Sequence, residues 1–489
     1  MSPAHHSGQR RWPVLLVVVA VIAGVSVAVA SRGTAPASAG SSGSPSALVS
    51  APDSESSAWY CTGMSRATGP APGALVLTST TPAPVTASVT AVSESGAVAH
   101  VTVSVPGDSV VSPAGTGLPS GSWKDFTVTV AGGGVAVSQW VRGPTGWGVA
   151  PCQSSTAANW YFAGGTTANS DGLFVSLLNP TSTPVVVDLS FMTPTGAVHP
   201  INYQGLVLPP GQVVVENVAS EVQNTSTVST VITARTGRFV ASELQVFSGS
   251  SSGLSVVPGV AEPSVHWAIP QGEENSGGNS EIDVFNPGST PEAVRVHLRL
   301  ASGPLAPLSA NVAPGSTWVV ATNKQTRIPA GAPYSVTVDA SGGAGVVVGR
   351  TVLAPGSAAS PQAGLASGVA EWSMRSQTGE WVVPPPGTSA YPATGGAARH
   401  SLALSNTSGA PATYRVYGVT PSGQRLLASG TLAPGLFSLV PASALSAAGF
   451  EPIVVRADRS LGVSEDLAPS GALGVVTMPG LPLAAAIGL

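Results

Sequence analysis

Short apolar runs alternate with polar residues along most of the chain, and turns rich in proline and glycine separate them. Residues 158–260 hold about seven such runs, among them LFVSLLN, VVVDLSFM, QVVVENV and TVITART. Strict alternation is typical of strands that bury one face, whereas a helix repeats apolar residues every three or four positions. The pattern therefore predicts an all-β protein with little helix.

Four similar units follow one another, and each begins with a tryptophan. The four segments are AWYC, NWYF, HWAI and EWVV, with tryptophans at Trp59, Trp160, Trp267 and Trp381. Successive tryptophans are 101, 107 and 114 residues apart. A repeat of this kind indicates that one structural unit occurs four times.

Two turn motifs recur after each tryptophan. The first contains a proline, preceded by an asparagine in three units (LTSTTPAPV, LNPTSTPV, FNPGSTPE and SNTSGAPA), and such asparagines favour turns by bonding their own backbone. The second contains a glycine 48, 51, 48 and 54 residues after its tryptophan, at Gly107, Gly211, Gly315 and Gly435. Agreement in all four units supports the repeat.

About seven strands in roughly 100 residues predict a β-sandwich of immunoglobulin or fibronectin type. A propeller blade uses about 40 to 50 residues, so the repeat length argues against a four-bladed propeller. We therefore expect four tandem β-sandwiches, listed here by range: 58–153, 158–260, 264–368 and 378–489.

The N-terminal region predicts a membrane anchor and a tether. Residues 13–30 are uninterruptedly apolar and follow Arg10 and Arg11, as in a signal anchor or a cleaved signal peptide. Positive charge before this segment favours a cytoplasmic location for residues 1–12. Residues 31–57, rich in serine, alanine, glycine and proline, are expected to form a disordered linker. The remainder then lies outside the cytoplasmic membrane, or is secreted if the signal is cleaved.

Composition agrees with an extracytoplasmic location. Charged residues make up only 9% of the chain, and the net charge of −4 offers no basic surface for nucleic acid. The chain contains two cysteines, Cys61 and Cys152, and in an oxidising compartment they are expected to form a disulfide.

The sequence presents no motif for catalysis, for a cofactor or for a metal. The three glycines in FTVTVAGGGVAVSQWV lie between two strand-like runs in a place that recurs in every unit, so we expect a β-hairpin rather than a phosphate loop, which needs a helix after it. Ser251 in GSSSG is expected in a linker between units. The acidic loop around Glu281 and Asp283 lacks the spacing of a calcium site.

Two other tryptophans are candidates for carbohydrate contact. Trp140 and Trp147 lie close together in QWVRGPTGWG, outside the recurring position. Aromatic rings can stack on the apolar faces of sugars, whereas a tryptophan that recurs once per unit is typical of a core residue.

With its N-terminal apolar segment, its linker and its repeated tryptophan and turn motifs, the chain resembles an actinobacterial family of membrane-anchored secreted proteins of unknown function. The resemblance covers the chain from Trp59 to the C-terminus and implies no functional residues. The first unit departs from it, because it lacks the asparagine turn and carries both cysteines.

These observations predict a non-enzymatic scaffold or binding protein of the cell envelope. Its expected partners are the cytoplasmic membrane, through residues 13–30, and an envelope protein or polysaccharide. A carbohydrate-binding protein or adhesin of the cell surface is a narrower alternative. An envelope glycosidase with two carboxylates is the competing class.

Overall fold

The computed structural model describes residues 47–113, 121–273, 279–354, 362–385, 397–440, 442–446, 451–469 and 475–485. They belong to one compact unit, Ser44–Leu489. Within these ranges no helix has the length and hydropathy needed to cross a bilayer. The expected membrane segment, residues 13–30, and residues 31–46 of the expected linker lie outside the described residues.

The strands form eight antiparallel sheets, and each repeat supplies two of them. One sheet contains the strand of the repeat's tryptophan, and we call it the Trp blade. The other ends on a strand that lines a central cavity, and we call it the axial blade. The chain of one repeat crosses between its two blades several times.

The first two repeats contain 17 of the strands. In repeat 1 the Trp blade has the order β1 (Ser57–Ser65), β6 (Trp123–Ala131), β3 (Val85–Ser93), β4 (Val98–Val105), and the axial blade has β5 (Val110–Val111), β2 (Gly73–Ser79), β7 (Val135–Arg142), β8 (Trp147–Pro151). In repeat 2 the Trp blade has β12 (Gly196–Val198), β11 (Val185–Thr193), β15 (Val228–Thr236), β9 (Asn159–Gly165), with β13 (Gln204–Leu208) beside β11, and the axial blade has β14 (Gln212–Asn217), β10 (Gly172–Asn179), β16 (Val240–Phe247), β17 (Gly253–Pro258).

Repeats 3 and 4 have the same plan. In repeat 3 the Trp blade has β21 (Gly303–Pro304), β20 (Glu292–Leu300), β24 (Pro333–Ser341), β18 (His266–Glu273), β27 (Val369–Ala370), with β22 (Leu308–Val312) beside β20, and the axial blade has β23 (Ser316–Ala321), β19 (Asn279–Asn286), β25 (Val347–Ala354), β26 (Gln362–Ser367). In repeat 4 the Trp blade has β31 (Gly423–Leu432), β30 (Ala412–Thr420), β33 (Ile453–Ala457), β28 (Glu380–Val383), β36 (Leu481–Pro482), and the axial blade has β32 (Phe437–Val440), β29 (Ala397–Asn406), β34 (Leu461–Pro469), β35 (Val476–Pro479).

Among the described residues, helical structure is confined to short segments between strands. The described helices are α2 (Glu371–Met374), α3 (Ala442–Ser446) and the 3-10 turns Ala168–Ser170, Ile201–Tyr203, Val218–Ser220 and Thr322–Lys324. The prediction of an all-β protein is therefore confirmed.

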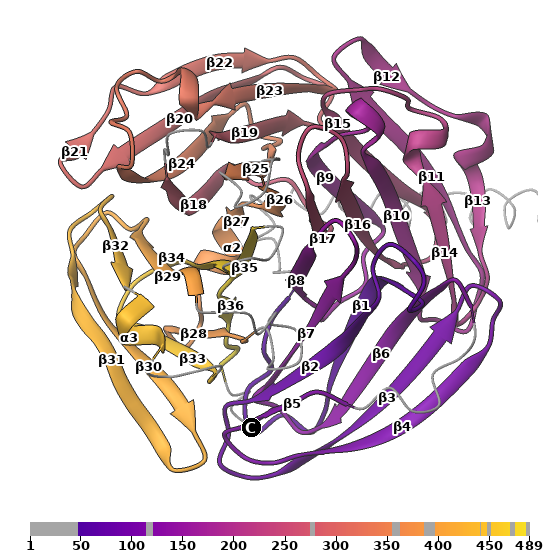
Figure 1. Ribbon diagram of the computed structural model, residues 1–489, viewed down its shortest axis with the longest axis horizontal. Coiled ribbons are helices and arrows are strands. Elements are labelled where there is room, and N and C mark those ends of the chain that lie inside the picture. The colour runs from indigo at the N-terminus through magenta and orange to yellow at the C-terminus, as the bar shows by residue number, and fades with distance from the viewer. Residues whose placement is uncertain are drawn as a thin grey trace, which may run out of the picture. The chain divides into compact units, whose positions relative to one another are not determined.

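The prediction of four tandem immunoglobulin-like or fibronectin-like sandwiches is wrong. The eight sheets are arranged as an eight-bladed β-propeller, in which blades follow one another around the unit (Figure 1). The repeat of roughly 100 residues is twice the length of a blade, because one repeat builds two blades with interleaved strands. The repeat length therefore did not exclude a propeller.

The glycine turn at 132–134 joins two blades and does not form a hairpin. β6, before the turn, pairs with β1 and β3, whereas β7, after it, pairs with β2 and β8. A strand follows the glycines directly, so the segment lacks the helix of a phosphate loop. Ser251, expected in a linker between units, instead lies in the turn between paired strands β16 and β17.

The asparagine turns are confirmed. The Asn179 side chain donates to the carbonyl oxygens of Thr183 and Leu208 at 2.8 and 2.9 Å and accepts from the Thr181 amide. Asn286 and Asn406 make the same three hydrogen bonds in their own repeats. Each side chain thus satisfies backbone groups of two turns at once, which explains why the motif recurs.

The recurring tryptophans are core residues. Trp59, Trp160, Trp267 and Trp381 are all buried, with at most 1% of their surface exposed. β20, in the sheet of Trp267, alternates strictly: its even positions 292 to 300 are buried, and the residues between them are at least partly exposed. One polar and one apolar face per strand is what a blade needs when it packs against a neighbour.

The axial strands pack backbone to backbone where glycine leaves room. A Cβ atom at Gly253 would lie 2.0 Å from the Ala363 carbonyl oxygen, and one at Gly364 would lie equally close to that of Val475. Such distances are impossible for any residue with a side chain. These glycines allow β17 to meet β26, and β26 to meet the segment leading into β35.

The N-terminal segment closes the ring. Val49 bridges Leu483 in parallel, donates to the Pro482 carbonyl oxygen at 3.0 Å and accepts from the Ala484 amide at 2.9 Å. Ser50 accepts from the Gly134 amide, and a Cβ atom at Gly133 would overlap the Ala51 carbonyl oxygen. The triple-glycine turn is thus the docking surface for the closing segment.

The prediction of a disordered linker is wrong for residues 47–57. Residues 47–57 belong to the range expected to be disordered, yet Ala47, Val49 and Ala51 are buried in the structure. Their small apolar side chains pack against repeats 1 and 4. Composition alone predicted disorder here, because the residues that order the segment, such as Gly134 and Leu483, are distant in the chain.

The disulfide is confirmed. Cys61 in β1 and Cys152 after β8 are bonded, with Cα atoms 4.7 Å apart. The bond joins the Trp blade of repeat 1 to the end of its axial blade, and the two cysteines are 91 positions apart in the sequence. Cross-linking a loop of that length removes entropy from the unfolded chain, which stabilises the fold.

Carboxyl groups are buried where repeats meet. Asp125 in repeat 1 accepts hydrogen bonds from the Gly63 amide and from the Ser176 hydroxyl of repeat 2. Asp283 of repeat 3 packs against Gly164 of repeat 2. Burial raises the pKa of each of these two carboxyls to about 7. Both groups are therefore protonated more readily in the folded protein than in the unfolded chain.

Shortening Val49 tests ring closure. Val49→Ala is expected to lower the free energy of unfolding by about 2 kcal/mol, because a fully buried side chain loses its packing against two repeats. Urea unfolding measures the change, and the exposed Val98 supplies a control, since Val98→Ala should shift stability by less than about 0.5 kcal/mol. Equal effects of the two substitutions would contradict a closing role for Val49.

The buried carboxyls predict a pH dependence of stability. Because the folded pKa of Asp125 lies above its unfolded value, its contribution is fully favourable below about pH 4 and is lost as the pH rises through about 7. Asp125→Asn should therefore match the wild type at pH 4 and be more stable at pH 8, by on the order of 2–4 kcal/mol. Urea titrations at both pH values measure this. Exposed Asp53→Asn is the control, and a difference between D125N and wild type that does not change with pH would refute the assignment.

Candidate functional site

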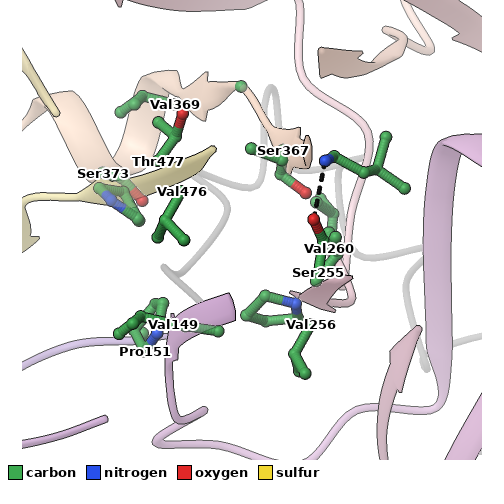
Figure 2. Close-up of a pocket in the computed structure, with 18 of the residues that line it drawn as sticks. Val149, Pro151, Ser255, Val256, Val260, Ser367, Val369, Ser373, Val476 and Thr477 are labelled. Carbon is green, nitrogen blue, oxygen red and sulfur yellow. Dashed lines mark hydrogen bonds between the residues drawn. The ribbon is translucent and has the colours of Figure 1, made fainter. Parts of the chain in front are cut away.

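A small apolar cavity lies where the axial strands of all four repeats come together. Its volume is about 90 Å3, enough for only a few waters. Figure 2 shows aliphatic side chains around it, including Val149, Val256, Val369 and Val476. The Ser255 hydroxyl accepts a hydrogen bond from the Leu365 amide at 2.9 Å, across two repeats. The cavity is small, and the Ser255 hydroxyl joins two repeats. We therefore interpret the cavity as a packing defect between the axial strands and not as a ligand site.

A larger and more polar cleft lies between repeats 3 and 4. Its volume is about 640 Å3, within the range of small-molecule sites. One wall comes from the Trp blade of repeat 3, the second from α2, and the third from three turns of repeat 4. The lining residues are His266, Trp267, Arg299, Thr337, Asp339, Glu371, Met374, Arg375, Asn406, Thr407, Ser408, Gly409, Pro434, Gly435 and Ser460.

Two histidines converge on one carboxylate at the repeat 3 wall. The Asp339 carboxylate lies 2.7 Å from Nδ1 of His266 and 3.1 Å from Nε2 of His297. The three residues come from the adjacent strands β18, β20 and β24, whose register places His266 and Arg295 on either side of Asp339. The side chains of His266 and Asp339 are about half exposed, so the cleft presents a hydrogen-bonding surface in contact with solvent.

The second wall carries an ion pair within one turn of α2. Glu371 pairs with Arg375, four residues later, and the Arg375 side chain is largely exposed. Helical spacing of three or four residues places such side chains on the same face. This pair leaves little net charge on the α2 wall.

The repeat 4 wall is built from the recurring turns. Asn406 holds its turn through the three hydrogen bonds described above, and its carbonyl oxygen accepts from the Gly435 amide at 2.9 Å. The Ser408 hydroxyl donates within the same turn. The turn is therefore rigid, and it presents the exposed Gly409 to the cleft with no atom within 4 Å of where its Cβ would lie.

This arrangement suits binding of a polar ligand. Donors and acceptors from three directions surround an open volume, as in sites that hold a hydrophilic molecule. Among the described residues, no group of three His, Cys, Asp or Glu could hold a metal ion. Asp339 and Glu371 are the two carboxylates that line the cleft.

The predicted carbohydrate-contact residues lie elsewhere. Trp147 in β8 is 1% exposed and packs with Trp381 and Met478 of repeat 4, on the inner side of the ring. Trp140 in β7 is half-buried and lies against the same cluster. Sugar stacking on Trp140 stays a prediction, whereas Trp147 offers no exposed ring face in this conformation. Asp283 of the acidic loop is buried in β19, and residues 274–278 lie outside the described ranges.

The cleft residues could not be identified from the sequence, because His266, His297 and Asp339 are far apart in the chain and no motif links them. A signal was present: His266 begins the strand of the repeat's tryptophan and Asp339 lies near the end of β24, so antiparallel pairing of those two strands brings them together. Arg299 gave a second signal, considered below.

Comparison with known proteins gives the chain a family and little more. No curated protein matches it. A crystal structure titled as a tetra-tandem repeat in the extending region of a large adhesion protein is 9% identical, covers 87% of this chain and 99% of its own, and has a TM-score of 0.11. A crystal structure of two B repeat units of the collagen-binding protein of Staphylococcus aureus is 8% identical, covers 84% of this chain and 99% of its own, and has a TM-score of 0.09. Scores this low carry no structural argument. The model of a family of unknown function, DUF5719, matches residues 142–428, more than half of the chain, and the protein therefore belongs to that family.

Proposed function

We propose that this protein is a non-enzymatic binding protein of the cell envelope, and that the cleft between repeats 3 and 4 is its ligand site. The observation that carries the proposal is the cleft itself: about 640 Å3 with polar groups on all three walls. The junctions after repeats 1 and 2 combine apolar packing with buried, hydrogen-bonded polar groups. An open polar junction costs packing energy, which is readily explained if a ligand uses it.

Three features support an extracytoplasmic location. The chain contains a disulfide, which persists in oxidising compartments. Its residues 13–30 form an apolar segment after two arginines. Its surface carries few charges for its size. We propose that residues 13–30 hold the chain in the cytoplasmic membrane and that the propeller lies outside.

Filling the cleft tests the binding function. Gly409→Trp should abolish retention of the full-length protein on purified cell-wall material while leaving its thermal unfolding midpoint unchanged, because the new ring enters open space. Ser289→Trp is the matched control, since Ser289 holds the same turn position in repeat 3 and is exposed outside this cleft. Co-sedimentation with the wall measures retention. If both variants are retained like the wild type, the cleft is not the binding site.

Glycoside hydrolysis is the competing function, because Asp339 and Glu371 line the same cleft. Both carboxylates are engaged by neighbouring groups, His266 and His297 for Asp339 and Arg375 for Glu371. A binding protein should release no reducing ends from wall polysaccharide over hours. Release that disappears in Glu371→Gln would establish an enzyme and overturn the non-enzymatic proposal.

Membrane attachment has its own test. The wild type should remain in the membrane fraction after an alkaline carbonate wash, because about 18 apolar residues of helix approach the thickness of the hydrocarbon core. Replacing Val18 and Val19 with arginine should release the protein or block its export. Mature protein in the medium that begins near residue 31 would show a cleaved signal instead.

A further inference from the structure

Arg299 occupies a position that is apolar in the other three repeats. The eighth residue of β3, β11, β20 and β30 is Val92, Met192, Arg299 and Val419, respectively. These strands are equivalent, since each begins directly after the proline of the recurring turn. Three repeats place an aliphatic or thioether side chain at this point, and one places a guanidinium.

The apolar residues at two of these positions fill the junction to the next repeat. Val92 is buried and packs with Leu178 and Val240 of repeat 2. Met192 packs against the core of repeat 3, where its sulfur lies 3.5 Å from the Cβ position of Gly315. The corresponding junction between repeats 3 and 4 holds Arg299 and opens into the cleft. At the junction of repeats 3 and 4, a charged side chain beside an open cleft thus takes the place of the apolar side chain that fills the two preceding junctions.

The repeat 4 turn makes room for the guanidinium. A Cβ atom at Gly435 would lie 2.6 Å from Cζ and from Nη1 of Arg299, so a larger residue there would displace the guanidinium from its present place. Gly435 belongs to the recurring turn, whose equivalent Gly315 contacts Met192. Arg299 is therefore held by the fold at a defined place on the cleft wall.

Arg299 is a cation without a counter-ion among the described residues. Its Nε is buried and makes no hydrogen bond within the described chain. The other charges of the cleft are engaged: Glu371 with Arg375, and Asp339 with His266 and His297. A buried donor without a partner costs about 1–3 kcal/mol, and more when it is charged. A ligand oxyanion would satisfy it.

We propose that Arg299 is an anion-binding residue and that the ligand is an oligosaccharide carrying oxyanions. This inference rests on the proposed binding function of the cleft. A guanidinium presents paired donors that match carboxylate and phosphate oxygens. The hydroxyl-bearing residues Thr337, Thr407 and Ser460 also line the cleft and suit the hydroxyls of a sugar. Carboxylate and phosphate glycans share this chemistry, and titration distinguishes them.

The test uses the full-length protein and three probes: trigalacturonic acid, its methyl ester, and maltotriose phosphate. Isothermal titration should show saturable binding of at least one acidic probe and at least tenfold weaker binding of the neutral ester. Arg299→Met should weaken the acidic probe at least tenfold, which corresponds to about 1.4 kcal/mol. The R299M variant should bind the ester as the wild type does. It should also fold, since Met192 fills the equivalent place in repeat 2.

Arg415→Met supplies the charge-matched control. Arg415 is exposed on β30, does not line the cleft, and its loss changes net charge by the same amount. This variant should bind within twofold of the wild type. Equal losses in R299M and R415M would indicate a diffuse electrostatic effect and overturn the assignment.

The outcomes separate this inference from the proposed function. Equal binding of the acid and its ester, abolished by Gly409→Trp, would leave the cleft as a binding site and overturn the role of Arg299. If no acidic probe binds the wild type, the proposed ligand class is wrong. If wall retention is also insensitive to Gly409→Trp, the binding function of the cleft fails as well.

Discussion

Closure of the ring is the constraint on which the rest of the structure depends. The core of repeat 1 packs against residues of repeat 2 on one side and of repeat 4 on the other, and the contact with repeat 4 exists only because the last repeat meets the first. Here Val49 pairs with Leu483, and the triple-glycine turn receives the backbone of Ser50 and Ala51. The disulfide fixes repeat 1, which accepts this segment. The central strands, the junction carboxyls and the cleft all depend on the repeats being held side by side.

The repeats differ at their junctions more than in their cores. The tryptophan, the asparagine turn and the strand alternation are kept because each satisfies the interior of one repeat. The contact between repeats varies from Val92 to Met192 to Arg299. A tandem architecture of this kind lets one junction acquire a polar cleft while the others remain packed. Departure from the repeat is thus a more useful guide to function here than the repeat itself.

Local features were predictable from the sequence. The strand content, the repeat, the buried tryptophans and the asparagine turns each follow from residues close together in the sequence. The disulfide follows from the presence of two cysteines in the chain. The arrangement of the blades could not be predicted from the sequence. The strands of one repeat are divided between two sheets, and the same order of strands also fits a sandwich. The pairing of β6 with β1 and β3, and of β7 with β2 and β8, is invisible in a run of valines and glycines. The cleft depends on the equivalent pairing of β24 with β18 and β20 in repeat 3, so its residues stayed scattered in the sequence.

The bridge between Val49 and Leu483 joins residues 434 positions apart, and this has a consequence for synthesis. Contacts of such long range form late, because the chain must first pay the entropy of closing a large loop. Leu483 is also synthesised long after Val49. Until Leu483 has been made, the backbone groups of Val49 that pair with this region have no partner. During that interval the unpaired segment can accept a strand from another chain, and pairing with Leu483 removes this risk.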